Sequence, residues 1–138
     1  MTQETIAFIG GGNMATSLIA GLIADGQDPR GLIVSDPDQD KLDALATSFS
    51  IRTVKENTEA IRNADVVLLC IKPQMAIRVC HELALTLGRR KPLVISVMAG
   101  IREKSIQEWL GGGMPLVRVM PNTPAMIQAG AIVLHATR

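Results

Sequence analysis

The feature of the sequence that most constrains the fold is a glycine-rich turn near the N-terminus. Residues 5–9 form a short apolar run, and residues 10–15 read GGGNMA, which fits the pattern G-x-G-x-x-[G/A]. From residue 14 to residue 24 the apolar side chains recur at the spacing of an α-helix. A strand, a tight glycine turn and a helix in this order are typical of a βαβ unit that binds a dinucleotide.

The small residues of this turn have distinct physical roles in such a unit. Gly10 allows the chain to turn tightly out of the strand, and Gly12 lets backbone amides approach a pyrophosphate. The small Ala15 lets the helix pack closely against the sheet. Free N–H groups and the positive end of the helix dipole then face the anion. Because glycines also form ordinary tight turns, a purely structural turn is the alternative.

The rest of the sequence alternates short apolar runs with segments of helical periodicity. Further strands are expected at residues 32–34, 66–71, 92–98, 116–120 and 131–134, with weaker candidates at Ile51 and Val54. Helices are expected after residue 37, from residue 75 to residue 87 and at residues 105–110. Strands that are apolar throughout are buried on both faces, as in a parallel sheet covered by helices. The sequence therefore predicts one domain over residues 1–138 with a doubly wound α/β fold, a mostly parallel sheet with helices on both faces.

Composition excludes several classes of function. With 14 Lys and Arg against 13 Asp and Glu, the chain lacks the basic field of a nucleic-acid-binding protein. Aromatic residues are 2% of the chain, too few for stacking bases. No apolar run approaches the roughly 18 residues that cross a bilayer, and the first residues lack the pattern of a secretory signal. We therefore expect a cytoplasmic protein without nucleic-acid or membrane partners.

No catalytic acid, base or metal site stands out in the sequence. His81 lies in a helical stretch and is expected to be exposed, and neither His81 nor His135 has the companions of a Ser-His-Asp or Cys-His unit. Cys70 and Cys80 do not have the spacing of a metal site or a disulfide framework, and we expect two reduced thiols. Trp109 is expected to be a packing residue. The sequence therefore predicts no catalytic residue in this chain.

The end of the second strand bears on the choice between NAD and NADP. An acidic residue there hydrogen-bonds the ribose 2′-hydroxyl and repels a 2′-phosphate. Asp36 follows Gly10 slightly later than the usual spacing of about 20 residues, and it favours NAD modestly. A helix cap or a turn is an equally good explanation of this residue. Possible partners for a phosphate are Ser35, Arg30, Lys41 and Arg52.

Ligands of open α/β sheets gather beyond the carboxyl ends of the strands, and three later strand ends have suitable residues. Residues 70–73 read CIKP, residues 97–100 read VMAG, and residues 120–124 read MPNTP. The first places Lys72 beside a rigid turn, and the second suits the close approach of a ring. The third holds Asn122 and Thr123 between two prolines, which restrict its conformation. A solvated side chain is an equally good explanation of Lys72. For Asn122 and Thr123, a turn and a helix cap are about equally good explanations.

Four segments together resemble pyrroline-5-carboxylate reductase over essentially the whole chain. They read FIGGGNMA at 8–15, IKPQ at 71–74, SVMAG at 96–100 and VMPNTPA at 119–125. The resemblance implies a Rossmann-type domain and hydride transfer from a nicotinamide cofactor, usually NADPH and possibly NADH. The acceptor would be the C=N carbon of 1-pyrroline-5-carboxylate, and the product would be L-proline, as in proline biosynthesis. A protonated cyclic imine is already electrophilic, so positioning would supply much of the catalysis.

The resemblance also implies which residues meet the cofactor. At the glycine turn these are Ile9, Gly10, Gly11, Gly12, Asn13 and Met14. Ser35 and Asp36 would contact the adenosine ribose, and Asn57, Cys70, Ile71, Lys72 and Pro73 would lie along the cofactor. Val97, Met98 and Ala99 would approach the nicotinamide, and Asn122 and Thr123 would lie near the substrate.

The resemblance is to the cofactor-binding half of that family only. The family continues into an all-helical domain that supplies the dimer interface and a loop for the substrate carboxylate, and nothing in these 138 residues matches it. The sequence leaves open whether it is a fragment or a natural short form, and we expect it to bind cofactor but to reduce substrate poorly alone. Two other interpretations remain, namely the nucleotide domain of a hydroxyacid dehydrogenase and a non-catalytic NAD(P)-sensing module. Residues 122–124 weigh against the dehydrogenase.

Overall fold

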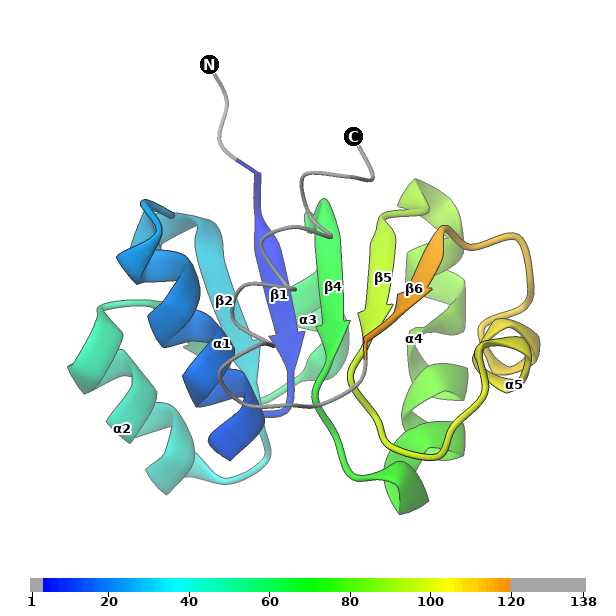
Figure 1. Cartoon of the computed structure of the whole chain (residues 1–138), viewed down its shortest axis with the longest axis horizontal. Helices are drawn as coiled ribbons and strands as arrows, with labels where there is room; N and C mark the ends of the chain where they lie inside the picture. The colour runs from blue at the N-terminus through cyan, green and yellow to red at the C-terminus, as the bar shows by residue number, and fades with distance from the viewer. Residues whose placement is uncertain (1–3, 120–138) are drawn as a thin grey trace.

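A computed structural model of the chain describes residues 4–119, which form one parallel sheet with helices on both faces (Figure 1). The strands are β1 (Ile6–Ile9), β2 (Leu32–Ser35), β3 (Arg52–Val54), β4 (Val66–Leu69), β5 (Leu93–Ser96) and β6 (Leu116–Arg118). Their order in the sheet is β3-β2-β1-β4-β5-β6, and every adjacent pair is parallel. The order reverses between β1 and β4, so the predicted doubly wound fold is confirmed.

The helices divide between the two faces of the sheet. They are α1 (Asn13–Ala24), α2 (Gln39–Phe49), α3 (Asn57–Ile61), α4 (Ala76–Arg90) and α5 (Glu103–Trp109), with short 3-10 turns η1 (Pro29–Gly31) and η2 (Pro73–Met75). One hydrophobic cluster joins the sheet to α1 and α2, and a second joins it to α3, α4 and α5. This arrangement follows from right-handed crossovers that place helices on alternate sides of a switch point.

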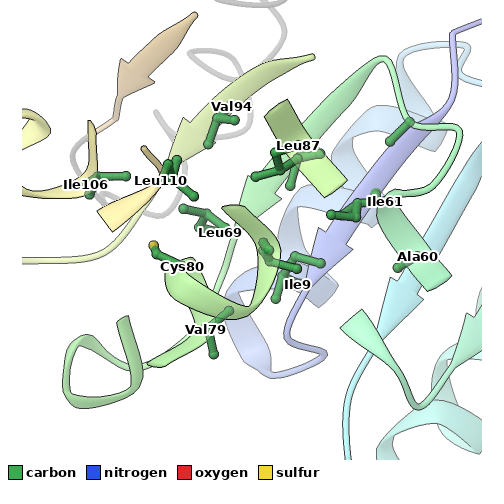
Figure 2. Packing of buried hydrophobic residues seen from close by; sticks show 14 of the residues in the cluster. Ile9, Ala60, Ile61, Leu69, Val79, Cys80, Leu87, Val94, Ile106 and Leu110 are labelled. Atoms are coloured by element: carbon green, nitrogen blue, oxygen red, sulfur yellow. The ribbon is translucent and has the colours of Figure 1, made fainter. Parts of the chain in front are cut away.

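Alternate residues of each strand enter the two cores. In β1, Phe8 packs toward α1 and α2, whereas Ile9 belongs to the core under α3, α4 and α5. In that second core, Ile9 and Leu69 from the sheet lie near Val79 and Leu87 of α4 (Figure 2). All four residues of β1 are buried, which explains why the strand is apolar throughout.

The register of the sheet brings the strand ends to one level. Ile9 pairs with Ser35 and with Leu69, Ser35 pairs with Val54, and Leu69 pairs with Ser96. The residues that follow these ends therefore lie along one edge of the sheet, where α1 begins (Figure 1). In an open α/β sheet this edge is where ligands bind.

Several local predictions changed in the structure. The strands expected at 66–71 and 92–98 are shorter, because β4 ends at Leu69 and β5 at Ser96. Helix α3, which the sequence did not indicate, follows the short edge strand β3. The strand expected at 131–134 lies outside the described residues. Among residues 4–119, no helix combines the length and the apolar character needed to cross a membrane.

Candidate functional site

The glycine turn packs directly against the end of β4. Gly10 has φ of +102°, and its N–H donates to the carbonyl oxygen of Ser35 at 2.9 Å. A Cβ atom on Gly10 would collide with the carbonyl oxygen of Cys70. Both the backbone conformation and the available space therefore require glycine here.

Asp36 connects the glycine turn to the loop after β2. Its Oδ2 accepts a hydrogen bond from the N–H of Gly11 at 2.8 Å, and its Oδ1 accepts one from the N–H of Asp38 at 2.8 Å. The residue is buried, with 8% of its surface exposed. The turn function that the sequence left open for Asp36 is therefore present in the structure.

Gly12 leaves the start of α1 open. It is the N-terminal cap of the helix, no side chain caps the first turn, and no acidic residue lies in that turn. A Cβ atom built on Gly12 meets nothing within 4 Å. The first-turn amides and the helix dipole therefore face an open space, which is the arrangement that binds phosphate groups. Ala15, fully buried, packs α1 against the sheet.

A cavity of about 460 Å³ lies beside this turn, at the carboxyl ends of β1, β2 and β4. It is lined by Gly10, Gly11, Gly12, Ser35, Asp36, Pro37, Lys41, Lys55, Glu56, Asn57, Cys70, Ile71, Lys72, Met75, Arg78, Val79 and Glu82. Its volume lies within the range of roughly 300–1,000 Å³ that is typical of ligand and cofactor sites. Its position is the switch point at which doubly wound folds bind nucleotides.

Nine of the residues predicted to meet a cofactor lie in the wall of this cavity. They are Gly10, Gly11, Gly12, Ser35, Asp36, Asn57, Cys70, Ile71 and Lys72. Two of them are joined, because the hydroxyl of Ser35 donates to Oδ1 of Asn57 at 2.7 Å. This bond connects the end of β2 to the start of α3.

The other predicted residues lie outside the cavity wall. Ile9 is fully buried in the core, so its side chain does not face the cavity. Asn13 and Pro73 are exposed nearby, and Met14 packs against the core. Val97, Met98 and Ala99 follow β5, the strand next to β4, and the first two are buried. Asn122 and Thr123 lie outside the described residues.

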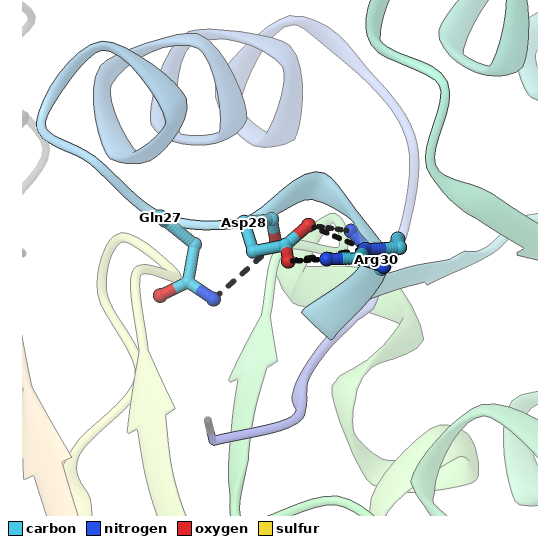
Figure 3. Close-up of polar contacts among 3 residues, drawn as sticks. All are labelled: Gln27, Asp28 and Arg30. Carbon is cyan, nitrogen blue, oxygen red and sulfur yellow. Dashed lines mark hydrogen bonds and ion pairs between the residues drawn. The ribbon is translucent and has the colours of Figure 1, made fainter. Parts of the chain in front are cut away.

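The sequence suggested two of the four cations in the cavity wall, Lys41 and Lys72. Lys41, Lys55, Lys72 and Arg78 line the cavity. Arg30 instead forms an ion pair with Asp28 at 2.7 Å, in the 3-10 turn that precedes β2 (Figure 3). The hydrogen bonds within this ion pair, more than its charge–charge attraction, raise the pKa of Arg30 and lower the pKa of Asp28.

Strand direction explains why Arg30 and Arg52 are not at the site. Arg30 precedes β2, and so it lies at the opposite edge of the parallel sheet. Arg52 begins β3 and pairs with Ile33, which places it before the carboxyl end of the strand. Of the three cations suggested from the sequence as partners for a phosphate, only Lys41 lines the cavity.

Two parts of the cavity wall were not predicted from the sequence. Lys55 and Glu56 follow β3, a strand with only weak apolar character. Met75, Arg78, Val79 and Glu82 form one face at the start of α4, and their spacing of three and four residues is the signal that could have indicated this face. Pro37, next to Asp36 in the sequence, is a further lining residue that was not predicted.

The two thiols are not nucleophiles at neutral pH. Burial raises the pKa of Cys70 to about 12 and the pKa of Cys80 to about 11. Since the thiolate is the reactive form, the cavity-lining Cys70 contributes a neutral surface. Both cysteines are free, and no group of three or more metal-ligating side chains occurs within residues 4–119.

Comparisons with known proteins agree with this geometry. Pyrroline-5-carboxylate reductase of Pseudomonas aeruginosa is 46% identical over 136 residues, which are 99% of this chain and 50% of that protein. The solved structure of a pyrroline-5-carboxylate reductase from Coxiella burnetii is 42% identical, with a TM-score of 0.86 over 92% of this chain and 47% of that one. A pyrroline carboxylate reductase of Plasmodium falciparum, solved with NADP bound, is 25% identical, with a TM-score of 0.77 over 92% of this chain and 45% of that one.

The chain spans about half the length of the curated relatives that it matches. Residues 5–100 match the family model described as NADP oxidoreductase coenzyme F420-dependent. This matched segment contains the glycine turn and every residue that lines the cavity. The chain therefore belongs to the family of NADP oxidoreductases, coenzyme F420-dependent, that this model describes.

Proposed function

We propose that this chain binds NADPH for a pyrroline-5-carboxylate reductase, which transfers hydride to the C=N carbon of 1-pyrroline-5-carboxylate. The observation that carries the proposal is the cavity at the switch point, with Gly12 open to it and the first turn of α1 uncapped. The likeness to pyrroline-5-carboxylate reductases over nearly the whole chain supports the choice of reaction.

The residues of the cavity suit the parts of a dinucleotide. The pyrophosphate would lie at Gly12 and the amides that begin α1, where negative charge is stabilised, since the N–H of Gly11 already donates to Asp36. The adenosine ribose would lie near Ser35 and Asn57, at the end of β2, and the remainder would extend past Cys70 and Lys72. NADPH, when bound, supplies the hydride, and the chain's own residues bind and orient it.

Val97, Met98 and Ala99 would approach the nicotinamide, and Asn122 and Thr123 the substrate, as the resemblance implies. Assembly into a homo-oligomer would depend on the family's helical domain. A cytoplasmic location is supported by two free cysteines, which are typical of a reducing compartment.

The test is a calorimetric titration of the 138-residue chain with NADPH and NADH, combined with an assay of substrate reduction. We expect saturable binding of one nucleotide per chain and reduction far slower than an ordinary enzyme turnover of about 1–1,000 per second. Absence of binding up to millimolar nucleotide would contradict the proposal. Turnover at an ordinary rate would overturn only the expectation that the chain is a poor catalyst alone. Nucleotide binding by a longer chain that also carries the helical domain, but with no reduction of the imine, would favour a sensing module.

A further inference from the structure

The carboxylate of Asp36 is already occupied by backbone groups. An acidic residue that selects NAD presents its oxygens to the ribose hydroxyls. Here one oxygen accepts from the N–H of Gly11 and the other from the N–H of Asp38, both at 2.8 Å. The two amide dipoles also offset part of the negative charge that would repel a phosphate. Asp36 therefore holds the glycine turn against the loop after β2.

Two lysines flank Asp36 on neighbouring elements. Lys55 directly follows Val54, whose carbonyl oxygen accepts a hydrogen bond from the N–H of Asp36 at 3.2 Å. Lys41 lies in the first turn of α2, the helix that begins after the Asp36 loop. Both lysines line the cavity and are exposed, and neither forms an ion pair with a residue in the described range 4–119.

The cavity wall carries four cations and three carboxylates, which leaves a formal net charge of +1. Its cations are Lys41, Lys55, Lys72 and Arg78, and its carboxylates are Asp36, Glu56 and Glu82. Asp36 is already hydrogen-bonded to two amides. Beside Lys41 and Lys55, Glu56 is then the carboxylate of the wall left to balance the two positive charges. Ser35, whose hydroxyl donates to Oδ1 of Asn57, adds a polar group to the same wall.

On the basis of the proposed function, we infer that Lys41 and Lys55 bind the 2′-phosphate of NADPH and that Asp36 is a positioning residue. Lys41 and Lys55 would then determine the preference for NADPH over NADH. Asp36 would act through Gly11 by fixing the turn that receives the pyrophosphate. The modest preference for NAD that Asp36 suggests from the sequence is thereby reversed.

The lysines are tested by titrating Lys41→Met, Lys55→Met and the double variant with NADPH and NADH. Because each lysine would form a charge-assisted hydrogen bond to the phosphate, each single change should weaken the binding of NADPH about tenfold or more. The affinity for NADH should change by less than about twofold, since NADH lacks the 2′-phosphate. Arg30→Met is the matched control, because Arg30 is paired with Asp28 away from the cavity, and it should leave both affinities unchanged.

Asp36 is tested by the conservative variant Asp36→Asn. The side-chain amide has one acceptor oxygen instead of two, so the turn should loosen. The affinities for NADPH and NADH should then fall by a similar factor, and the ratio of the two affinities should stay the same. If Asp36 instead bound the ribose hydroxyls, Asp36→Asn would selectively lower the affinity for NADH and raise the affinity for NADPH. That outcome would overturn the positioning function. Should Asp36→Asn fail to fold, a selective loss of NADPH affinity in the lysine variants still decides the inference.

Fragments of the cofactor separate this inference from the proposed function. The wild-type chain should bind 2′-phospho-ADP-ribose at least about tenfold more tightly than ADP-ribose, and the double lysine variant should bind the two alike. Equal binding of both fragments by the wild-type chain would contradict the inference and leave nucleotide binding intact. Failure of the wild-type chain to bind any of these nucleotides would instead contradict the proposed function.

Discussion

The carbonyl oxygen of Cys70 occupies the position that a side chain on Gly10 would need. The two residues follow β1 and β4, which pair in parallel with Ile9 level with Leu69. The N–H of Cys70 donates to the carbonyl oxygen of Ile9 at 2.8 Å, so the two strand ends are bonded immediately before the turn. The position of the glycine turn is thus determined by the neighbouring strand as well as by its own conformation.

Gly10→Ala should therefore be strongly destabilising. The positive φ costs an alanine roughly 1–2 kcal/mol, and the collision with the Cys70 backbone adds roughly 1–3 kcal/mol more. Chemical denaturation should show a free energy of unfolding lower by about 3 kcal/mol. Gly26→Ala is the matched control, because Gly26 has the same φ of +102° but open space around its Cβ position. It should cost only about 1 kcal/mol, and equal losses in the two variants would refute the collision.

Alkaline pH should reveal the buried thiol of Cys80. Burial raises its pKa to about 11 in the folded protein, whereas in the unfolded chain it ionises near pH 8.5. The folded state therefore retains a proton that the unfolded state loses, and stability is full below about pH 8.5 and falls as the pH rises toward 11. By pH 10 the loss should be about 2 kcal/mol.

The matched comparison for this pH dependence is Cys80→Ala. Its absolute stability is lower because of the cavity that it leaves, but its decline between pH 8 and pH 10 should be shallower than in the wild-type chain. Denaturant unfolding at several pH values measures both slopes. Identical declines with pH in the two proteins would show that the Cys80 thiol does not contribute to the pH dependence of stability.

Asp65 should stabilise the opposite edge of the sheet through two contacts of unequal value. Its carboxylate accepts from the N–H of Thr5 at 2.9 Å and pairs with Arg90 at 3.0 Å. The ion pair is well exposed, with 42% and 47% of the side-chain surfaces accessible, so Arg90→Met should cost less than about 0.5 kcal/mol. Asp65→Ala also removes the acceptor for a backbone amide and should cost about 1 kcal/mol. Denaturation at low and high salt checks this, since only the Arg90 contribution should decrease with salt.

Apolar runs and the glycine motif were enough to predict most of the fold. The runs that contain Phe8, Val67 and Ile95 became buried central strands because both faces of the sheet are covered. β3 and α3 were weak or missing in the sequence, since an edge strand with an exposed Arg52 and a five-residue helix carry little periodicity. Tertiary pairing with β2 stabilises β3 where its own sequence pattern is weak.

The candidate site was predictable where it depended on local conformation. Gly10 and Gly12 have the conformation and the open space that their proposed functions require. The sequence did not reveal that Lys55 lies beside Asp36, because that depends on β3 pairing with β2 in a defined register. Arg30 precedes β2 and Lys41 follows it, so the direction of the predicted strand was enough to separate these two cations. Asn122 and Thr123 remain predictions.

The most direct test of the account is calorimetric titration of NADPH into the wild-type chain and into Gly12→Val. A Cβ on Gly12 meets no protein atom within 4 Å, so the variant should fold with a loss of about 1 kcal/mol or less. Its side chain would occupy the space that the pyrophosphate needs. We predict saturable binding by the wild-type chain and an affinity at least about tenfold weaker in folded Gly12→Val. Undiminished binding by Gly12→Val would contradict the central claim that the nucleotide lies at the glycine turn.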